Sequence, residues 1–129
     1  MKLASIDVGL KRIGVAICLT SNIVTPQNAI LRKNRHQAAN DVNAFLKEWE
    51  IEKLIVGFPS SSEDTQNRIK HFVNLLELKI PFEFQEENMS SHEAEELMKG
   101  EIKHKKDGRI DSIAAKIILE RFLAKKPSL

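Results

Sequence analysis

The amino-acid sequence contains no tyrosine, one tryptophan and one cysteine in 129 residues. A single cysteine, Cys18, cannot form a disulfide within the chain, which fits the reducing cytoplasm. Since Cys18 stands in an apolar run, we interpret it as a small core residue rather than a reactive thiol. The scarcity of aromatic side chains argues against a platform for stacking single-stranded bases, so any nucleic acid would be recognised by its backbone and shape.

Long apolar runs are also missing. No segment approaches the roughly 18 apolar residues of a membrane-spanning helix, and the first residues lack the charged and apolar regions of a secretory signal. We therefore expect no membrane partner. The sequence likewise contains no Walker A loop, zinc motif or nucleophile triad.

The composition is ordinary for a globular protein, with 42% apolar and 29% charged residues. A length of 129 residues, without repeats or linkers, predicts one domain spanning residues 1–129. The net charge is only +2, but both ends of the chain are basic and the centre is acidic. Either these are solvated faces of opposite sign, or the basic ends converge on a polyanion while central carboxylates hold a metal.

The apolar periodicity predicts alternating strands and helices. Two short apolar runs around a glycine-containing turn at residues 8–11 predict a hairpin, and Pro26 in the next run predicts an edge strand or an irregularity. Asn34 and Gln37 resemble a reciprocal helix cap. The expected strands are 2–7, 12–19, 23–31, 53–59 and 80–85. The expected helices follow residue 34, begin after a polar loop at about 60–67, and cover about 90–98 and about 109–124.

This order implies an α/β protein with one mixed five-stranded sheet, in which three antiparallel strands precede parallel ones and helices cover the faces. In open sheets of this kind, ligands bind beyond the carboxyl ends of the strands. Acidic residues stand at such places. Asp7 ends the first strand, Glu86 and Glu87 follow the last strand, and Asp111 lies near the start of the final helix on its apolar face.

Converging carboxylates repel one another unless a counter-ion is present, and an inward-facing acid such as Asp111 is costly without compensation. A hard divalent cation removes this repulsion. Mg²⁺ prefers oxygen ligands, and two such ions activate water and stabilise the leaving oxygen in phosphodiester cleavage. The spacing alone permits this site without requiring it, because Asp7 before Gly9 is also common turn chemistry.

Four blocks of the sequence, IDVGLKRIGVAI, LIVGFP, EENMSS and RIDSIAAKIILERFL, resemble the YqgF family in order and register over nearly the whole chain. The resemblance implies a ribonuclease H-like fold and a metal-dependent nuclease that processes the 5′ end of precursor 16S ribosomal RNA. It also implies Mg²⁺ or Mn²⁺ as cofactor, precursor rRNA or branched DNA as substrate, and the ribosomal small subunit as a partner.

The same resemblance implies roles for individual residues. The metal-binding catalytic acids would be Asp7, Glu87 and Asp111. Lys11 and Arg12 match a basic pair in the hairpin that would contact phosphates. Arg109 matches a basic position before the last block, and the nearby Lys106 is a further candidate for binding phosphate.

The chain also departs from the family pattern. Asn88 stands where the family has an arginine, and the loop after VGFP lacks glycines, so the substrate contacts are expected to differ. Two alternatives stay open: a Holliday junction resolvase-like DNA endonuclease, and a non-catalytic RNA-binding ribosome-assembly factor. Actin-like ATPases share the D-x-G hairpin but need two such domains, whereas 129 residues supply one. The presence of all three acids favours catalysis.

Overall fold

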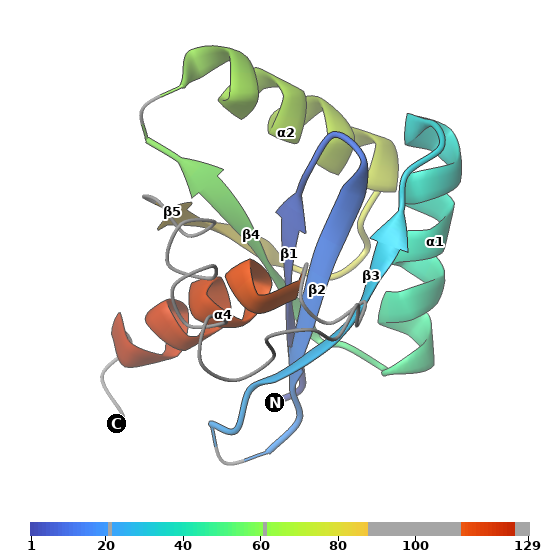
Figure 1. Cartoon of the computed structure of the whole chain (residues 1–129). Coiled ribbons are helices and arrows are strands. Elements are labelled where there is room, and N and C mark those ends of the chain that lie inside the picture. Colours follow the sequence, from blue (N-terminus) through green and yellow to red (C-terminus); the bar gives the residue numbers. More distant parts are fainter. Residues whose placement is uncertain (21, 61, 88–111, 126–129) are drawn as a thin grey trace, which may run out of the picture.

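The computed structural model describes residues 1–20, 22–60, 62–87 and 112–125. These residues form one five-stranded sheet with helices on both faces (Figure 1). The strands are β1 (Leu3–Val8), β2 (Arg12–Cys18), β3 (Thr25–Leu31), β4 (Lys53–Pro59) and β5 (Phe82–Glu87). The helices are α1 (Arg35–Glu48), α2 (Glu63–Leu76) and α4 (Ile113–Lys125).

The strand order is β3-β2-β1-β4-β5, so β1 lies at the centre of the sheet. β1 pairs antiparallel with β2 in a hairpin and parallel with β4, which in turn pairs parallel with β5. The predicted mixed sheet is therefore confirmed. β3 is an edge strand whose register against β2 shifts between Ile13 and Val15, as the proline in this segment predicted.

Two apolar clusters cover the two faces of the sheet. Ala4 and Ile6 of β1 belong to the cluster that α1 and α2 close, whereas Leu3 belongs to the cluster that α4 closes. This division follows from the alternation of side chains along a strand. Cys18 is buried in the α4 cluster, which confirms that it is a core residue.

The caps of the first two helices explain where these helices begin. The predicted reciprocal cap of α1 is present: Asn34 Oδ1 accepts from the backbone N–H of Gln37, and Gln37 Oε1 accepts from that of Asn34. The predicted loop at 60–67 is wrong in its second half, because α2 begins at Glu63. Ser62 caps this helix, and the acidic residues of its first turn suit the positive end of the helix dipole.

The last strand is longer than expected. Glu86 and Glu87 were placed after it, but they pair in register with Phe58 and Pro59 inside β5. The backbone hydrogen bonds offered by the end of β4 extend the strand through these charged residues. The helix expected at about 90–98 and the start of the one expected at about 109 lie outside the described residues. No helix in the described part is long and apolar enough to cross a membrane.

Candidate active site

Asp7 lies near the carboxyl end of the central strand, where its backbone pairs with Gly14 of β2. Along β1, Leu3, Ser5 and Asp7 alternate with the residues that face α1 and α2, so Asp7 is on the face that α4 covers. The register partner of Asp7 is a glycine and contributes no side chain on this face. On this face β2 therefore places no side chain directly opposite the carboxylate.

The surroundings of Asp7 disfavour its charged form. The side chain is partly buried, and this burial raises the pKa of the carboxyl group from 3.8 to about 6. Within the described ranges of the chain, no basic side chain forms an ion pair with Asp7. A desolvated carboxylate without a cationic side chain beside it is suited to bind a cation from solution.

Two buried serines attach α4 to the strands around Asp7. Ser5 Oγ donates to the carbonyl of Ala115 at 2.6 Å, and the backbone N–H of Val15 donates to Ser112 Oγ at 3.0 Å. Neither serine is exposed. The described start of the helix is thereby held next to Gly14, the register partner of Asp7.

Sequence reasoning missed the role of both serines. The available signal was a polar side chain, Ser5, in the middle of an otherwise apolar strand; such a residue is buried only with a hydrogen-bond partner. Ser112 directly follows Asp111 in the sequence and offered no comparable signal, because its partner, Val15, lies 97 residues away.

The end of β5 brings a second oxygen-bearing side chain to the same face of the sheet. Gln85 pairs with Gly57 of β4, and Gly57 directly follows Val56, which pairs with Ile6 of β1. Gln85 is 7% exposed, and its Oε1 is buried without a hydrogen-bond partner in the described structure. Its Nε2 donates only a long bond, 3.3 Å, to the carbonyl of Glu86.

The structure brings only part of the predicted acidic set into view. Glu87 is placed by its backbone, paired with Pro59 at the end of β5, and Asp111 lies outside the described residues. In the described part no group of three or more histidine, cysteine or acidic side chains is assembled for a metal. The donors that are described nevertheless fit a hard divalent cation, because an unpaired carboxylate at Asp7 and an orphaned amide oxygen at Gln85 are both oxygen ligands.

The turn that links β1 to β2 is tightly built. The N–H of Gly9 donates to the carbonyl of Arg12 at 3.0 Å, and a Cβ at residue 9 would lie 2.5 Å from that same oxygen. Glycine is therefore required here by the close approach of the backbone. The predicted phosphate-binding residues Lys11 and Arg12 are exposed in this turn, while Lys106 and Arg109 lie outside the described residues.

Arg32, which sequence reasoning did not single out, supports this turn from the end of β3. Its backbone N–H donates to the carbonyl of Lys11 at 2.9 Å, and its Nη1 donates to the carbonyl of Gly9 at 2.8 Å. Its guanidinium also lies over the ring of Phe72, 5.4 Å from the centroid. The turn is thus held to β3 and, through the aromatic contact, to α2.

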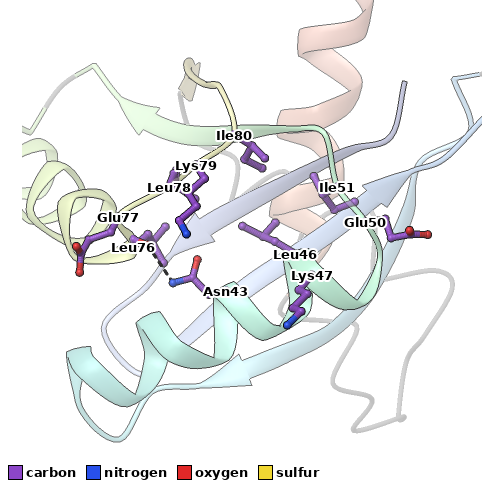
Figure 2. Close-up of a pocket in the computed structure, with 10 residues that line it drawn as sticks. All are labelled: Asn43, Leu46, Lys47, Glu50, Ile51, Leu76, Glu77, Leu78, Lys79 and Ile80. Atoms are coloured by element: carbon purple, nitrogen blue, oxygen red, sulfur yellow. Dashed lines mark hydrogen bonds between the residues drawn. The ribbon is translucent and has the colours of Figure 1, made fainter.

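A pocket of about 510 Å³ lies at the other end of the parallel strands (Figure 2). It is lined by residues that precede β4 and β5, among them Ile51 and Ile80, and by the ends of α1 and α2. There Asn43 Nδ2 donates to the carbonyl of Leu76 at 3.0 Å. Because Asp7 lies at the opposite, carboxyl end of β1, this pocket is separate from the candidate active site.

Comparison with known proteins adds sequence relatives to this geometry. Residues 1–125 match the family model RuvX, described as Holliday junction resolvase. A protein of Sulfurovum sp. (strain NBC37-1) is 68% identical over 127 residues, covering 96% of this chain and 99% of that protein. One of Sulfurimonas denitrificans is 50% identical over 129 residues, covering 98% and 99%. Both relatives carry the name "Putative pre-16S rRNA nuclease".

Solved structures of low sequence identity share the fold. The fowlpox virus resolvase in complex with its Holliday junction DNA has a TM-score of 0.58 at 15% identity, covering 97% of this chain and all of that one. Thermus thermophilus RuvC in complex with a Holliday junction has a TM-score of 0.51 at 16% identity, covering 97% and 95%. The expected ribonuclease H-like class, in its RuvC-like form, is confirmed at the level of the fold.

Proposed function

Because the chain belongs to the RuvX family, the YqgF family of the resemblance above, we propose that it is a metal-dependent nuclease acting on precursor 16S rRNA. It would hydrolyse phosphodiester bonds near the 5′ end of that RNA. Residues 1–129 would form a single nuclease domain. The observation that carries the proposal is Asp7: a desolvated carboxylate, without an ion-pair partner among the described residues, at the carboxyl end of the central strand.

Asp7, Glu87 and Asp111 are the acids that we assign to the metal centre. Two features support this set. Glu87 ends β5, where its backbone pairs with Pro59 at the end of β4. Ser112, the residue after Asp111, is held on β2 beside the register partner of Asp7. The end of β5 and the residue that follows Asp111 thus lie toward the end of the sheet that carries Asp7.

The metal would be Mg²⁺ or Mn²⁺, which when bound activates water and offsets the charge that develops on the phosphate. The chain's own contribution is to present the ligands. At pH 7 Asp7 is above its pKa of about 6 and is mostly ionised, so no proton must be removed before a cation binds. The exposed Lys11 and Arg12 of the β1–β2 turn, together with Lys106 and Arg109, would pair with the phosphates of the RNA.

A four-way DNA junction is the second candidate substrate. It is favoured by the description of the family as Holliday junction resolvases and by fold neighbours that were solved with junction DNA. Phosphate contacts do not distinguish the two, because they read a backbone and not its sequence. The third candidate is a non-catalytic RNA-binding factor. In that case the replacement of the family's arginine by Asn88 has abolished the nuclease activity.

The experiment compares the two substrates directly. Purified protein is incubated with 5′-extended small-subunit rRNA precursor and with four-way DNA junctions, with Mn²⁺ or with EDTA. Asp7→Asn is the test variant, and Asp41→Asn, which removes an exposed carboxylate from α1, is the matched control. We expect Mn²⁺-dependent cleavage of the RNA by wild type and Asp41→Asn and none by Asp7→Asn. If wild type and Asp7→Asn leave both substrates equally intact, or cleave them to the same extent, catalysis at this site is rejected.

A further inference from the structure

Three arginines from separate elements gather beside the β1–β2 turn, and we call Arg32, Arg35 and Arg68 the arginine cluster. Arg32 follows β3, Arg35 opens α1, and Arg68 lies in α2. The contact of Arg32 with the ring of Phe72 places it against α2. Since Arg68 is four residues before Phe72, one helical turn away on the same face, it is a neighbour of Arg32.

Figure 1 shows this end of the molecule, where the β1–β2 turn lies beside α2 and near the start of α1. The bond from the N–H of Arg32 to the carbonyl of Lys11 ties the cluster to the turn. Lys11, whose basic side chain is exposed, therefore lies at the same end of the molecule as the cluster. The arginine cluster extends from the β1–β2 turn toward α1 and α2, which cover the face of the sheet opposite to Asp7.

The positive charges of the cluster are not neutralised within the described structure. No described carboxylate forms an ion pair with Arg32, Arg35 or Arg68, and the one side-chain bond of Arg68 goes to Thr65 Oγ1 at 3.1 Å. The first turn of α1 has no acidic residue, so the positive end of its dipole adds to the field.

The mutual repulsion in the cluster is visible at Arg32. The pKa of its guanidinium is lowered, first by burial and then by the positive charges of Arg68 and Arg35. Like charges held together without an ion-pair partner destabilise the free protein. An anion with several charges that binds across the cluster would offset this repulsion.

We infer that the arginine cluster is a second phosphate-binding site, which holds the substrate's sugar–phosphate backbone where the strand passes over the β1–β2 turn toward α1 and α2. The inference rests on the proposed function in that it takes a nucleic acid as the substrate. Arg35 and Arg68 are exposed and would contact phosphates directly. Arg32, which is partly buried and bonded to Gly9, positions the turn and adds its charge.

The test measures binding without cleavage. The double variant Arg35→Gln/Arg68→Gln is compared with Lys47→Gln/Lys79→Gln, which removes the same charge from the rim of the distant pocket. Lys47 is in the last turn of α1, about 18 Å along the helix axis from Arg35. Affinity for a short RNA duplex and for a DNA duplex of the same sequence is measured in EDTA over a series of salt concentrations.

Each phosphate contact contributes about 0.7 to 0.9 to the slope of log affinity against log salt. The Arg35→Gln/Arg68→Gln variant should therefore lose about 1.4 to 1.8 of that slope, and the pocket variant should keep the wild-type slope. The charge-conserving variant Arg35→Lys/Arg68→Lys should restore most of it. Equal loss on RNA and DNA would assign the contact to phosphate, and loss on RNA alone would assign it to the RNA backbone; both support the site.

Identical slopes for the two double variants would overturn the inference. This outcome is independent of the proposed function, because no cleavage is measured. If wild type binds RNA but does not cleave it with Mn²⁺, the nuclease proposal fails while the slopes still decide the arginine cluster. Both pairs of side chains are exposed, so unchanged melting temperatures should show that neither variant has lost its fold.

Discussion

Replacing Asp7 with asparagine should make the protein more stable at neutral pH while removing its metal-dependent chemistry. Burial raises the pKa of Asp7 from 3.8 to about 6 in the folded chain. A carboxyl group whose pKa is higher in the folded than in the unfolded chain adds to the stability of the folded state only at low pH, where the group is protonated. That contribution is complete below pH 3.8 and is lost as the pH rises through about 6. At pH 7 the ionised Asp7 therefore costs stability.

The cost follows from the two pKa values. The interval from 3.8 to about 6 corresponds to about 3 kcal/mol at 1.36 kcal/mol for each pH unit. Partial exposure of the side chain reduces this upper value, so we expect Asp7→Asn to gain about 2 kcal/mol at pH 7 to 8. For a chain of this length the gain corresponds to a rise in melting temperature of about 6–10 °C. At pH 3.5 the two proteins should melt at nearly the same temperature.

The assay is thermal and urea unfolding of wild type, Asp7→Asn and the control Asp41→Asn from pH 3.5 to 8, first in EDTA and then with Mn²⁺. Mn²⁺ should raise the melting temperature of wild type and of Asp41→Asn and leave Asp7→Asn unchanged, because binding to the folded state alone stabilises it. A difference between wild type and Asp7→Asn that does not vary with pH would refute the electrostatic reasoning. An equal Mn²⁺ effect on both would refute Asp7 as a ligand.

Three further substitutions test the surroundings of Asp7. Ser112→Ala removes the acceptor of a buried N–H and should lower the free energy of unfolding in urea by about 1–3 kcal/mol; an unchanged midpoint would mean that water replaces the hydroxyl. Gly9→Ala places a methyl group 2.5 Å from the Arg12 carbonyl oxygen. It should lower the free energy of unfolding in urea by about 1–3 kcal/mol and weaken RNA binding. Wild-type stability and binding would show that the turn relaxes freely. Gln85→Leu removes an unpartnered buried oxygen, so it should melt no lower than wild type in EDTA yet gain less from Mn²⁺; a lower melting temperature in EDTA would show that the oxygen is already satisfied.

The sequence predicted those parts of the fold that depend on local patterns. The cap formed by Asn34 and Gln37 involves residues three apart, and the β1–β2 hairpin needs only neighbouring runs, so both were predicted and are confirmed. The continuous apolar run of β4 correctly indicated a strand with parallel neighbours on both sides. The end of β5 was missed, because its charged residues are held in the strand by pairing with β4 and not by their own propensity.

The candidate site was predictable only in part. Asp7 could be singled out as an acid at the end of an apolar strand, and its position is confirmed. Its raised pKa could not be predicted, because the degree of burial of a side chain depends on the tertiary packing around it. The arginine cluster was missed because its members are far apart in the sequence. The contact of Arg32 with the ring of Phe72 brings Arg32 to α2, the helix that carries Arg68. The roles of Glu87 and Asp111 stay predictions.

The attachment of α4 by Ser5 and Ser112 has a consequence for how the protein acquires its chemistry during synthesis. The hairpin and the β1–β4 pairing use residues made early, whereas the helix that covers the face carrying Asp7 is the last described element. Until that helix docks, Ala16 and Ile55, on the face of the sheet that carries Asp7, lack their cover. A partly synthesised chain can therefore form its sheet while this face is still open to water. The nuclease that we propose would then have its catalytic face covered only after α4 has been made.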